Sequence, residues 1–185
     1  MKTTLHILRL VGTLFLITAL VAAALAGVNA ITADRIAAAE TKKLQAAISE
    51  VLNGAGDYTA LDTFSDDTGL VKTVYSSSAG YAVEAAPAGF GGTVTIMVGV
   101  SPEGEVLGIS IVSHSETAGL GAVSASDAAA GRAFRDSFKG LTGKVTVSKD
   151  GGEADTITGA TITSRAVAEG VSAAIACVEK INKGA

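Results

Sequence analysis

The sequence of 185 residues predicts an α+β domain that follows one long apolar N-terminal helix. Residues 10–33 contain no charged side chain. Two alternating, β-branched stretches, 92–100 and 105–113, flank a Ser-Pro-Glu-Gly turn, which is typical of a β-hairpin. Apolar residues recur at helical spacing over 165–182, just before Gly184. Hairpins with helices between and after them favour a mostly antiparallel sheet flanked by helices.

The N-terminal segment predicts an uncleaved membrane anchor. As a helix at about 1.5 Å per residue, the uncharged residues 10–33 reach roughly 36 Å, more than the roughly 30 Å of a bilayer core. A cleaved signal peptide is the alternative, because the tripeptides at 24–26 and 28–30 resemble cleavage sites. The apolar stretch is longer than the about 7–15 residues usual for signal peptides, which favours the anchor. Lys2 and Arg9 favour an inside N-terminus and hence an extracytoplasmic body.

Between the anchor and the final helix, the sequence predicts a stalk helix, several strands and a short helix. Residues 31–52 lack glycine and proline and place apolar side chains on one helical face. Small and polar residues over 53–67 indicate a loop. We expect an anchor at 1–33, a stalk at 34–56 and a globular domain at 57–185. The predicted strands are residues 70–75, 81–85, 92–100, 105–113 and 144–148, and the short helix covers about 127–138.

The composition excludes several classes of function. One cysteine, Cys177, and two histidines, His6 and His114, cannot complete a zinc site of Cys and His ligands, an iron–sulfur cluster or a haem attachment motif. The formal net charge of −4 and the absence of a basic cluster argue against a nucleic-acid partner. Redox or group-transfer chemistry therefore requires an organic cofactor. Cys177 lies among apolar residues of a predicted helix, where we expect a buried, inert thiol.

Two polar segments interrupt the apolar pattern. The first, residues 114–121, directly follows a predicted strand, and His114 and Glu116 within it lack the third ligand that a metal site needs. The second, residues 155–164, directly precedes the final helix, with Thr163 or Ser164 as its predicted N-cap. The turn before a helix N-terminus favours an anion such as phosphate. A cap and a turn without any ligand are the alternative interpretation of the same residues.

Together the two segments resemble the FMN-binding domain family. Residues 155–161 read Asp-x-x-Thr-Gly-Ala-Thr, as in that family's flavinylation motif. Residues 114–121 read His-x-Glu-Thr-x-Gly-Leu-Gly, with Ala118 where the family usually has proline. The N-terminal anchor and the order of the motifs are most similar to the G subunits of Rnf ion-translocating electron-transport complexes. The C subunits of sodium-pumping NADH:quinone reductases are related and typically longer.

The resemblance implies a specific cofactor attachment. FMN would be joined through its phosphate to the Thr161 hydroxyl as a phosphoester, which a separate flavin transferase would form. Asp155 would belong to the signal that this transferase reads. Neither a catalytic residue nor a metal ligand is implied. The implied cofactor-binding residues are Thr161, Thr158, Gly159, Ala160, Asp155, Thr163, Glu116, Thr117, Gly119, Leu120 and His114, with Phe90 as an aromatic ring that would stack on the flavin.

The resemblance also implies a function and partners. The chain would relay electrons through FMN within an ion-translocating ferredoxin:NAD oxidoreductase complex, next to other membrane and iron–sulfur subunits. It would cross the inner cell membrane once, in contact with lipid, with its flavin domain on the extracytoplasmic side. One alternative is an anchored module that binds flavin or another phosphorylated ligand without a covalent bond. Another is a pilin-like structural subunit, but no acidic residue precedes Asp34, whereas pilins need a glutamate early in the helix.

Overall fold

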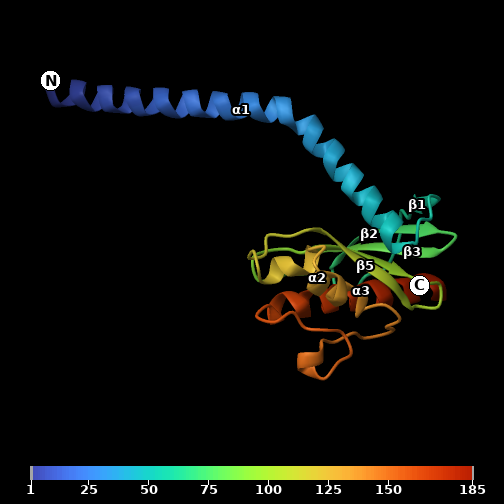
Figure 1. The fold of residues 1–185 in the computed structure, drawn as a ribbon. Coiled ribbons are helices and arrows are strands. Elements are labelled where there is room, and N and C mark those ends of the chain that lie inside the picture. Colours follow the sequence, from blue (N-terminus) through green and yellow to red (C-terminus); the bar gives the residue numbers. More distant parts are fainter. Residues whose placement is uncertain (1, 185) are drawn as a thin grey trace. The chain divides into compact units, whose positions relative to one another are not determined.

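The computed structural model describes residues 2–184 and shows a long helix followed by a five-stranded antiparallel sheet with flanking helices (Figure 1). This architecture confirms the α+β prediction. The chain divides into two compact units, residues 1–43 and residues 44–185. The helices are α1 (Lys2–Val51), η1 (Gly121–Ala125), α2 (Ala129–Asp136), η2 (Ser148–Asp150) and α3 (Thr161–Lys183); the strands are β1 (Tyr58–Ala60), β2 (Val71–Ser77), β3 (Gly80–Ala85), β4 (Thr95–Val100) and β5 (Val106–Ser113).

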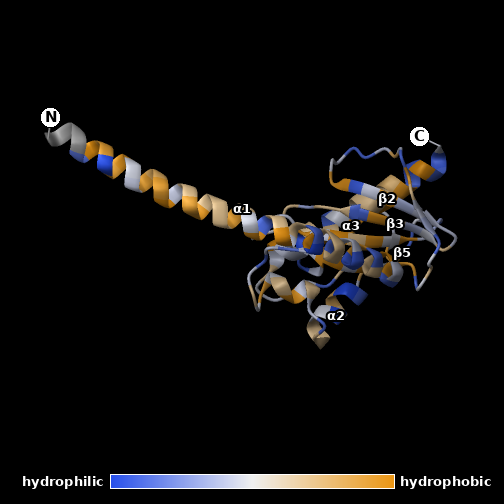
Figure 2. Cartoon of the chain, turned by 90° about the horizontal axis from the view of Figure 1, so that it is seen from above, coloured by the Kyte–Doolittle hydropathy of each residue, from blue (hydrophilic) through white to orange (hydrophobic). Residues whose placement is uncertain are grey.

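In the first unit, α1 has the properties of a helix that can cross a membrane. It runs without a break through the predicted anchor and most of the predicted stalk, and it is long and apolar enough to span a bilayer. Figure 2 shows the apolar colour along most of its N-terminal half. Large apolar side chains such as Leu8 and Phe15 are exposed. The hydroxyls of Thr18 and Thr32 donate to carbonyls of the same helix, so these polar groups need no water.

In the second unit, the sheet is a meander in which each strand pairs antiparallel with the next. The hairpin of β4 and β5 and the predicted strands at 70–75 and 81–85 are confirmed to within a few residues. Gly104 closes the β4–β5 turn at φ +89°, a conformation that favours glycine. The predicted loop over 53–67 contains the short edge strand β1, which the sequence pattern did not reveal.

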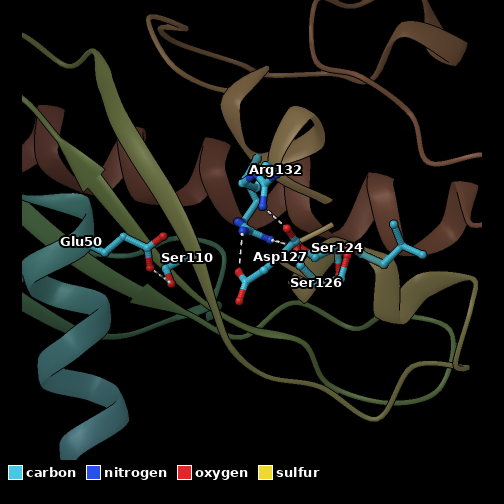
Figure 3. A network of polar contacts seen from close by, with 8 residues as sticks. Glu50, Ser110, Ser124, Ser126, Asp127 and Arg132 are labelled. Carbon is cyan, nitrogen blue, oxygen red and sulfur yellow. Dashed lines mark hydrogen bonds and ion pairs between the residues drawn. The ribbon is translucent and has the colours of Figure 1, made fainter. Parts of the chain in front are cut away.

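The two faces of the sheet are covered by different helices. Because side chains alternate along a strand, Val83 and Val98 face the main core with α3, whereas Ala82 and Met97 face the last turns of α1. A Cβ on Gly99 would collide with the Val51 carbonyl, so the helix end lies directly on β4. The hydroxyl of Ser110 on β5 donates to the Glu50 carboxylate at 2.6 Å (Figure 3).

Hydrogen bonds from α2 hold η1 and the turn that joins η1 to α2. The guanidinium of Arg135 on α2 donates to the carbonyls of Ser124 and Ser126 at 2.8 and 2.9 Å, and Arg132 donates to the Asp127 carbonyl. Figure 3 shows these three acceptor residues side by side beneath α2. The bonds fix η1 and the turn after it, and η1 directly follows the polar loop at 114–121.

The predicted strand over 144–148 is wrong. Val145 and Val147 are buried, as the alternation indicates, but the Val145 N–H donates to the Ser172 hydroxyl on α3. Only a single parallel bridge forms, between Val147 and Ala154, before the chain turns into η2. Alternation reports which side chains are buried, and it does not show that another strand is available for pairing.

Candidate functional site

The loop after β5 and the start of α3 enclose a cleft of about 370 Å³. Its volume falls in the range of about 300–1,000 Å³ typical of small-molecule sites. The two polar segments that stood out in the sequence therefore both line one cavity. The lining residues are Phe90, Glu116, Thr117, Leu120, Gly121, Lys149, Gly159, Ala160, Thr161, Ile162 and Thr163.

Three exposed apolar side chains rim this cleft. Phe90 is 69% exposed, Ile162 51% and Leu120 44%. Among the described residues, every other large apolar side chain with such exposure belongs to α1. Clustered exposed apolar surface outside a membrane segment marks a binding site, because it is costly to leave in water. The rim is thus suited to a flat apolar group.

The start of α3 differs from its prediction. The helix begins at Thr161, with Ala160 as N-cap, and neither Thr163 nor Ser164 caps it. Both hydroxyls have other partners. Thr163 donates to the Glu116 carboxylate at 2.6 Å, and Ser164 accepts from the Ile157 N–H and donates to the Ala160 carbonyl, both at 3.0 Å. The prediction of Thr163 or Ser164 as N-cap is therefore wrong, because the helix begins before both residues and their hydroxyls have other partners.

The uncapped start of α3 creates a place for an anion. Ala160 has no side-chain oxygen to accept from the first N–H groups of the helix. Gly159 adopts φ +79°, and the Ala160 N–H donates to the Ile157 carbonyl at 3.0 Å, so the turn before the helix is tight. Thr161, half-buried, follows directly. A hydroxyl nucleophile and free helix N–H groups thus meet at the cleft, which suits a phosphate ester.

Glu116 connects three segments at the cleft. Its buried carboxylate accepts the Thr163 hydroxyl from α3 and the Gly91 N–H from the loop before β4, at 2.6 and 3.0 Å. Its own N–H donates to Nδ1 of His114 at 3.2 Å. Hydrogen bonds to charged groups are stronger than those between neutral groups. The carboxylate therefore positions the 114–121 loop against both α3 and the Phe90 loop.

Two glycines make room for this carboxylate. A Cβ on Gly89 would collide with Oε1 of Glu116, and a Cβ on Gly121 with Oε2. Gly121 also lines the cleft. These close approaches explain why glycine occupies both positions without any unusual backbone angle.

Several predicted site residues lie outside this cleft. Gly119, Asp155 and Thr158 line a neighbouring cleft of about 310 Å³, on the side of Phe134. His114 lines neither cleft and acts as a hydrogen-bond acceptor within its loop. The structure thus brings together seven of the eleven predicted residues: Glu116, Thr117, Leu120, Gly159, Ala160, Thr161 and Thr163, together with Phe90.

Sequence reasoning missed Gly121, Ile162 and Lys149 as lining residues. Lys149 lies in η2, in a Lys-Asp-Gly-Gly sequence directly after the residues predicted as a strand, 144–148. The neighbouring Asp150 accepts from Nε and Nη2 of Arg165 on α3, at 2.7 and 2.6 Å. These two hydrogen bonds lower the pKa of Asp150 and raise that of Arg165.

The described residues contain no group of three or more His, Cys, Asp or Glu side chains that could hold a metal ion. Cys177 is buried on α3, as predicted, and burial raises the pKa of its thiol to about 11. The thiol therefore stays protonated and unreactive near neutral pH.

Comparison with known proteins identifies the family. The profile of the FMN-binding domain matches residues 89–176, and that of the RnfG N-terminal region matches residues 1–51. The G subunit of the Na(+)-translocating ferredoxin:NAD(+) oxidoreductase complex of Acetobacterium woodii is 32% identical, over 92% of this chain and 90% of that protein. The G subunit of the ion-translocating oxidoreductase complex of Methanosarcina acetivorans is 30% identical, over 95% of this chain and 96% of that protein. The corresponding G subunit of Stutzerimonas stutzeri is 34% identical, over 86% of this chain and 75% of that protein. The chain belongs to the family of Rnf complex G subunits and contains its FMN-binding domain.

Proposed function

We propose that this chain is an electron-transfer flavoprotein subunit of an ion-translocating ferredoxin:NAD oxidoreductase complex, with FMN bound covalently through its phosphate to Thr161. The relatives named as G subunits of such complexes support the assembly. The observation that carries the proposal is the position of Thr161, at the uncapped start of α3 and in the lining of a cleft with an apolar rim.

The cleft fits both ends of FMN. The apolar side chains of Phe90, Leu120 and Ile162 suit the isoalloxazine ring, since aromatic and aliphatic groups gain most from covering such a surface. The phosphate suits the first N–H groups of α3, beside Thr161. When bound, FMN supplies one-electron transfer, and the protein's part is to hold and orient it.

The attachment is a phosphoryl transfer. The Thr161 oxygen attacks the flavin-side phosphorus of a flavin dinucleotide, a new O–P bond forms, and the phosphoanhydride bond breaks. AMP leaves, and the hydroxyl proton passes to a base of the flavin transferase or to water. The product is a phosphodiester with one negative charge at the start of α3. Relative to the free chain and free FMN, the product has lost one water.

The same proposal includes a membrane location. α1 is long and apolar enough to cross a bilayer, and Lys2 and Arg9 favour a cytoplasmic N-terminus with the flavin domain on the extracytoplasmic side. A covalent bond then prevents loss of the cofactor outside the cytoplasm. We propose an anchor at 1–33, a stalk at 34–56 and a flavin domain at 57–185, with iron–sulfur and membrane subunits as partners. The end of the stalk packs on the sheet, through Ile48 and Leu52.

The test is the mass of the chain produced with and without a flavin transferase. With the transferase, the intact mass is expected to rise by the mass of one FMN less one water. The band of the chain on a denaturing gel is expected to show flavin fluorescence. Thr161→Val, which replaces the hydroxyl with a methyl group of similar size, is expected to abolish both signals, and Thr161→Ser, which keeps a hydroxyl, to retain them. An unmodified mass for the wild-type chain, or flavin that acid precipitation releases, contradicts the covalent link and favours non-covalent binding.

A further inference from the structure

We propose that Lys149 supplies the positive charge that faces the flavin phosphate, and that the Asp150–Arg165 ion pair holds it at the cleft. This inference rests on the proposed attachment of FMN to Thr161. It concerns a residue outside both sequence motifs, in the separate turn η2.

The position of Lys149 is the first argument. It lines the same cleft as Thr161 and is the only lysine or arginine among the lining residues. Within the described part of the chain, no carboxylate lies within ion-pair distance of its ammonium group. An exposed ammonium that forms no ion pair, beside a site for a phosphate, is free to contact that phosphate.

The second argument is the way in which η2 is attached. Asp150 binds Arg165 through two hydrogen bonds of 2.7 and 2.6 Å, and Arg165 lies one turn after Thr161 on α3. On the other side of Lys149, the Ser148 and Thr156 hydroxyls share a hydrogen bond of 3.1 Å, and the Lys149 N–H donates to Thr156 at 3.3 Å. The residue is thus fixed at both flanks to the segment that carries the attachment site.

The third argument is charge. The cleft contains the carboxylate of Glu116, which accepts hydrogen bonds from the Thr163 hydroxyl and the Gly91 N–H. A phosphodiester on Thr161 adds a second negative charge to the same cleft. Helix N–H groups provide only partial positive charge, about half an elementary charge at a helix end. Lys149 is the one full positive charge of the lining that can balance the phosphate.

The experiment measures the initial rate of flavin attachment to the purified full chain in detergent, with transferase and flavin dinucleotide. Lys149→Gln is expected to reduce this rate about tenfold, as for the loss of one charge-assisted contact to phosphate. Lys149→Arg is expected to restore most of it. Lys144→Gln, at an exposed lysine that lines other clefts, is the matched control with the wild-type rate. Arg165→Gln releases η2 and is expected to give an intermediate rate.

A second readout separates contact with the phosphate from contact with the transferase. In fully loaded protein, the phosphorus NMR signal of the phosphodiester is expected to shift in Lys149→Gln, and to respond to salt in the wild type only, since salt screens the ammonium. Equal attachment rates, or slower attachment with an unchanged phosphorus signal, would overturn the role of Lys149. A wild-type chain that accepts no flavin would instead overturn the proposed function.

Discussion

α1 and α3 are both long and apolar enough to cross a membrane, yet their side chains lie in opposite environments. No residue in the most apolar stretch of α1 is buried, whereas 67% of the most apolar stretch of α3 is buried inside the domain. The charged residues Arg165, Glu169 and Glu179 of α3 recur on one exposed stripe, and its other faces pack on the sheet. The N-terminal half of α1 has no such stripe. The distribution of charged residues around a helix therefore distinguishes the buried helix α3 from α1, the helix that we propose as the membrane anchor, although both pass the same test of length and apolar composition.

The largest expected effect is a charge on the buried side of α3. Val171 is fully buried, so Val171→Asp places an unpaired carboxylate in the core and is expected to lower the free energy of unfolding by more than about 4 kcal/mol. The matched variant Leu16→Asp, at a 69% exposed position of α1, is expected to leave the domain's melting temperature in detergent unchanged. Thermal unfolding followed by circular dichroism measures both melting temperatures. Similar values for the two variants would contradict the difference in burial between α3 and α1.

The second prediction concerns membrane attachment, which is expected to be sensitive to a charge change in α1 and insensitive to one in α3. In a bilayer, Leu16→Asp is expected to oppose insertion by about 2.5–3.5 kcal/mol, the cost of a charge near the centre of a spanning helix. Glu169→Gln, on the exposed stripe of α3, is expected to have no effect on membrane attachment. Carbonate extraction of membranes followed by immunoblotting measures the attached fraction. Full retention of the Leu16→Asp chain would show that α1 is not the anchor.

A smaller effect on the free energy of unfolding is expected when a threonine hydroxyl is replaced in either helix. Thr18 in α1 donates within its own helix to the Leu14 carbonyl, whereas Thr163 in α3 donates to Glu116, across the fold. Thr163→Val leaves a buried carboxylate with one partner fewer, at an expected cost of about 1–3 kcal/mol. Thr18→Val is expected to be neutral. Urea unfolding in detergent gives both differences, and a neutral Thr163→Val would mean that Glu116 does not depend on α3.

The smallest effect is the response of α3 to pH through Cys177. Burial raises the pKa of this thiol from 9.0 to about 11, so the folded chain keeps the proton more tightly than the unfolded chain. Its contribution to stability is present below pH 9 and is lost as the pH rises toward 11. We expect slow maleimide labelling at pH 8 in the native state and fast labelling in urea. Cys177→Ala is expected to flatten the stability profile between pH 9 and 11, and a profile equal to that of the wild type would contradict the shift.

Most elements of the fold could be predicted, because they depend on patterns within a few residues. The β4–β5 hairpin follows from alternation and a turn sequence, and the end of α3 follows from Gly184, which adopts φ +73° as the C-cap. The strand over 144–148 could not be predicted correctly. The alternation of Val145 and Val147 correctly indicates that both are buried, but they lie against α3 and Ala154 and do not join the five-stranded sheet. The local pattern does not distinguish these two ways of burying a side chain.

The motif residues of the candidate site were likewise visible in the sequence, but their arrangement was not. Local spacing favours Thr163 or Ser164 as the helix cap, which would have placed Thr161 outside α3. The hydrogen bond from Thr163 to Glu116 joins residues 47 positions apart, and it engages the Thr163 hydroxyl that the local pattern assigns to the helix cap. Thr161 thereby becomes the first residue of an uncapped helix, and Lys149 reaches the same cleft through the Asp150–Arg165 ion pair. Short-range propensities set the elements, whereas competition for hydrogen-bond partners between distant segments set the chemistry of the cleft.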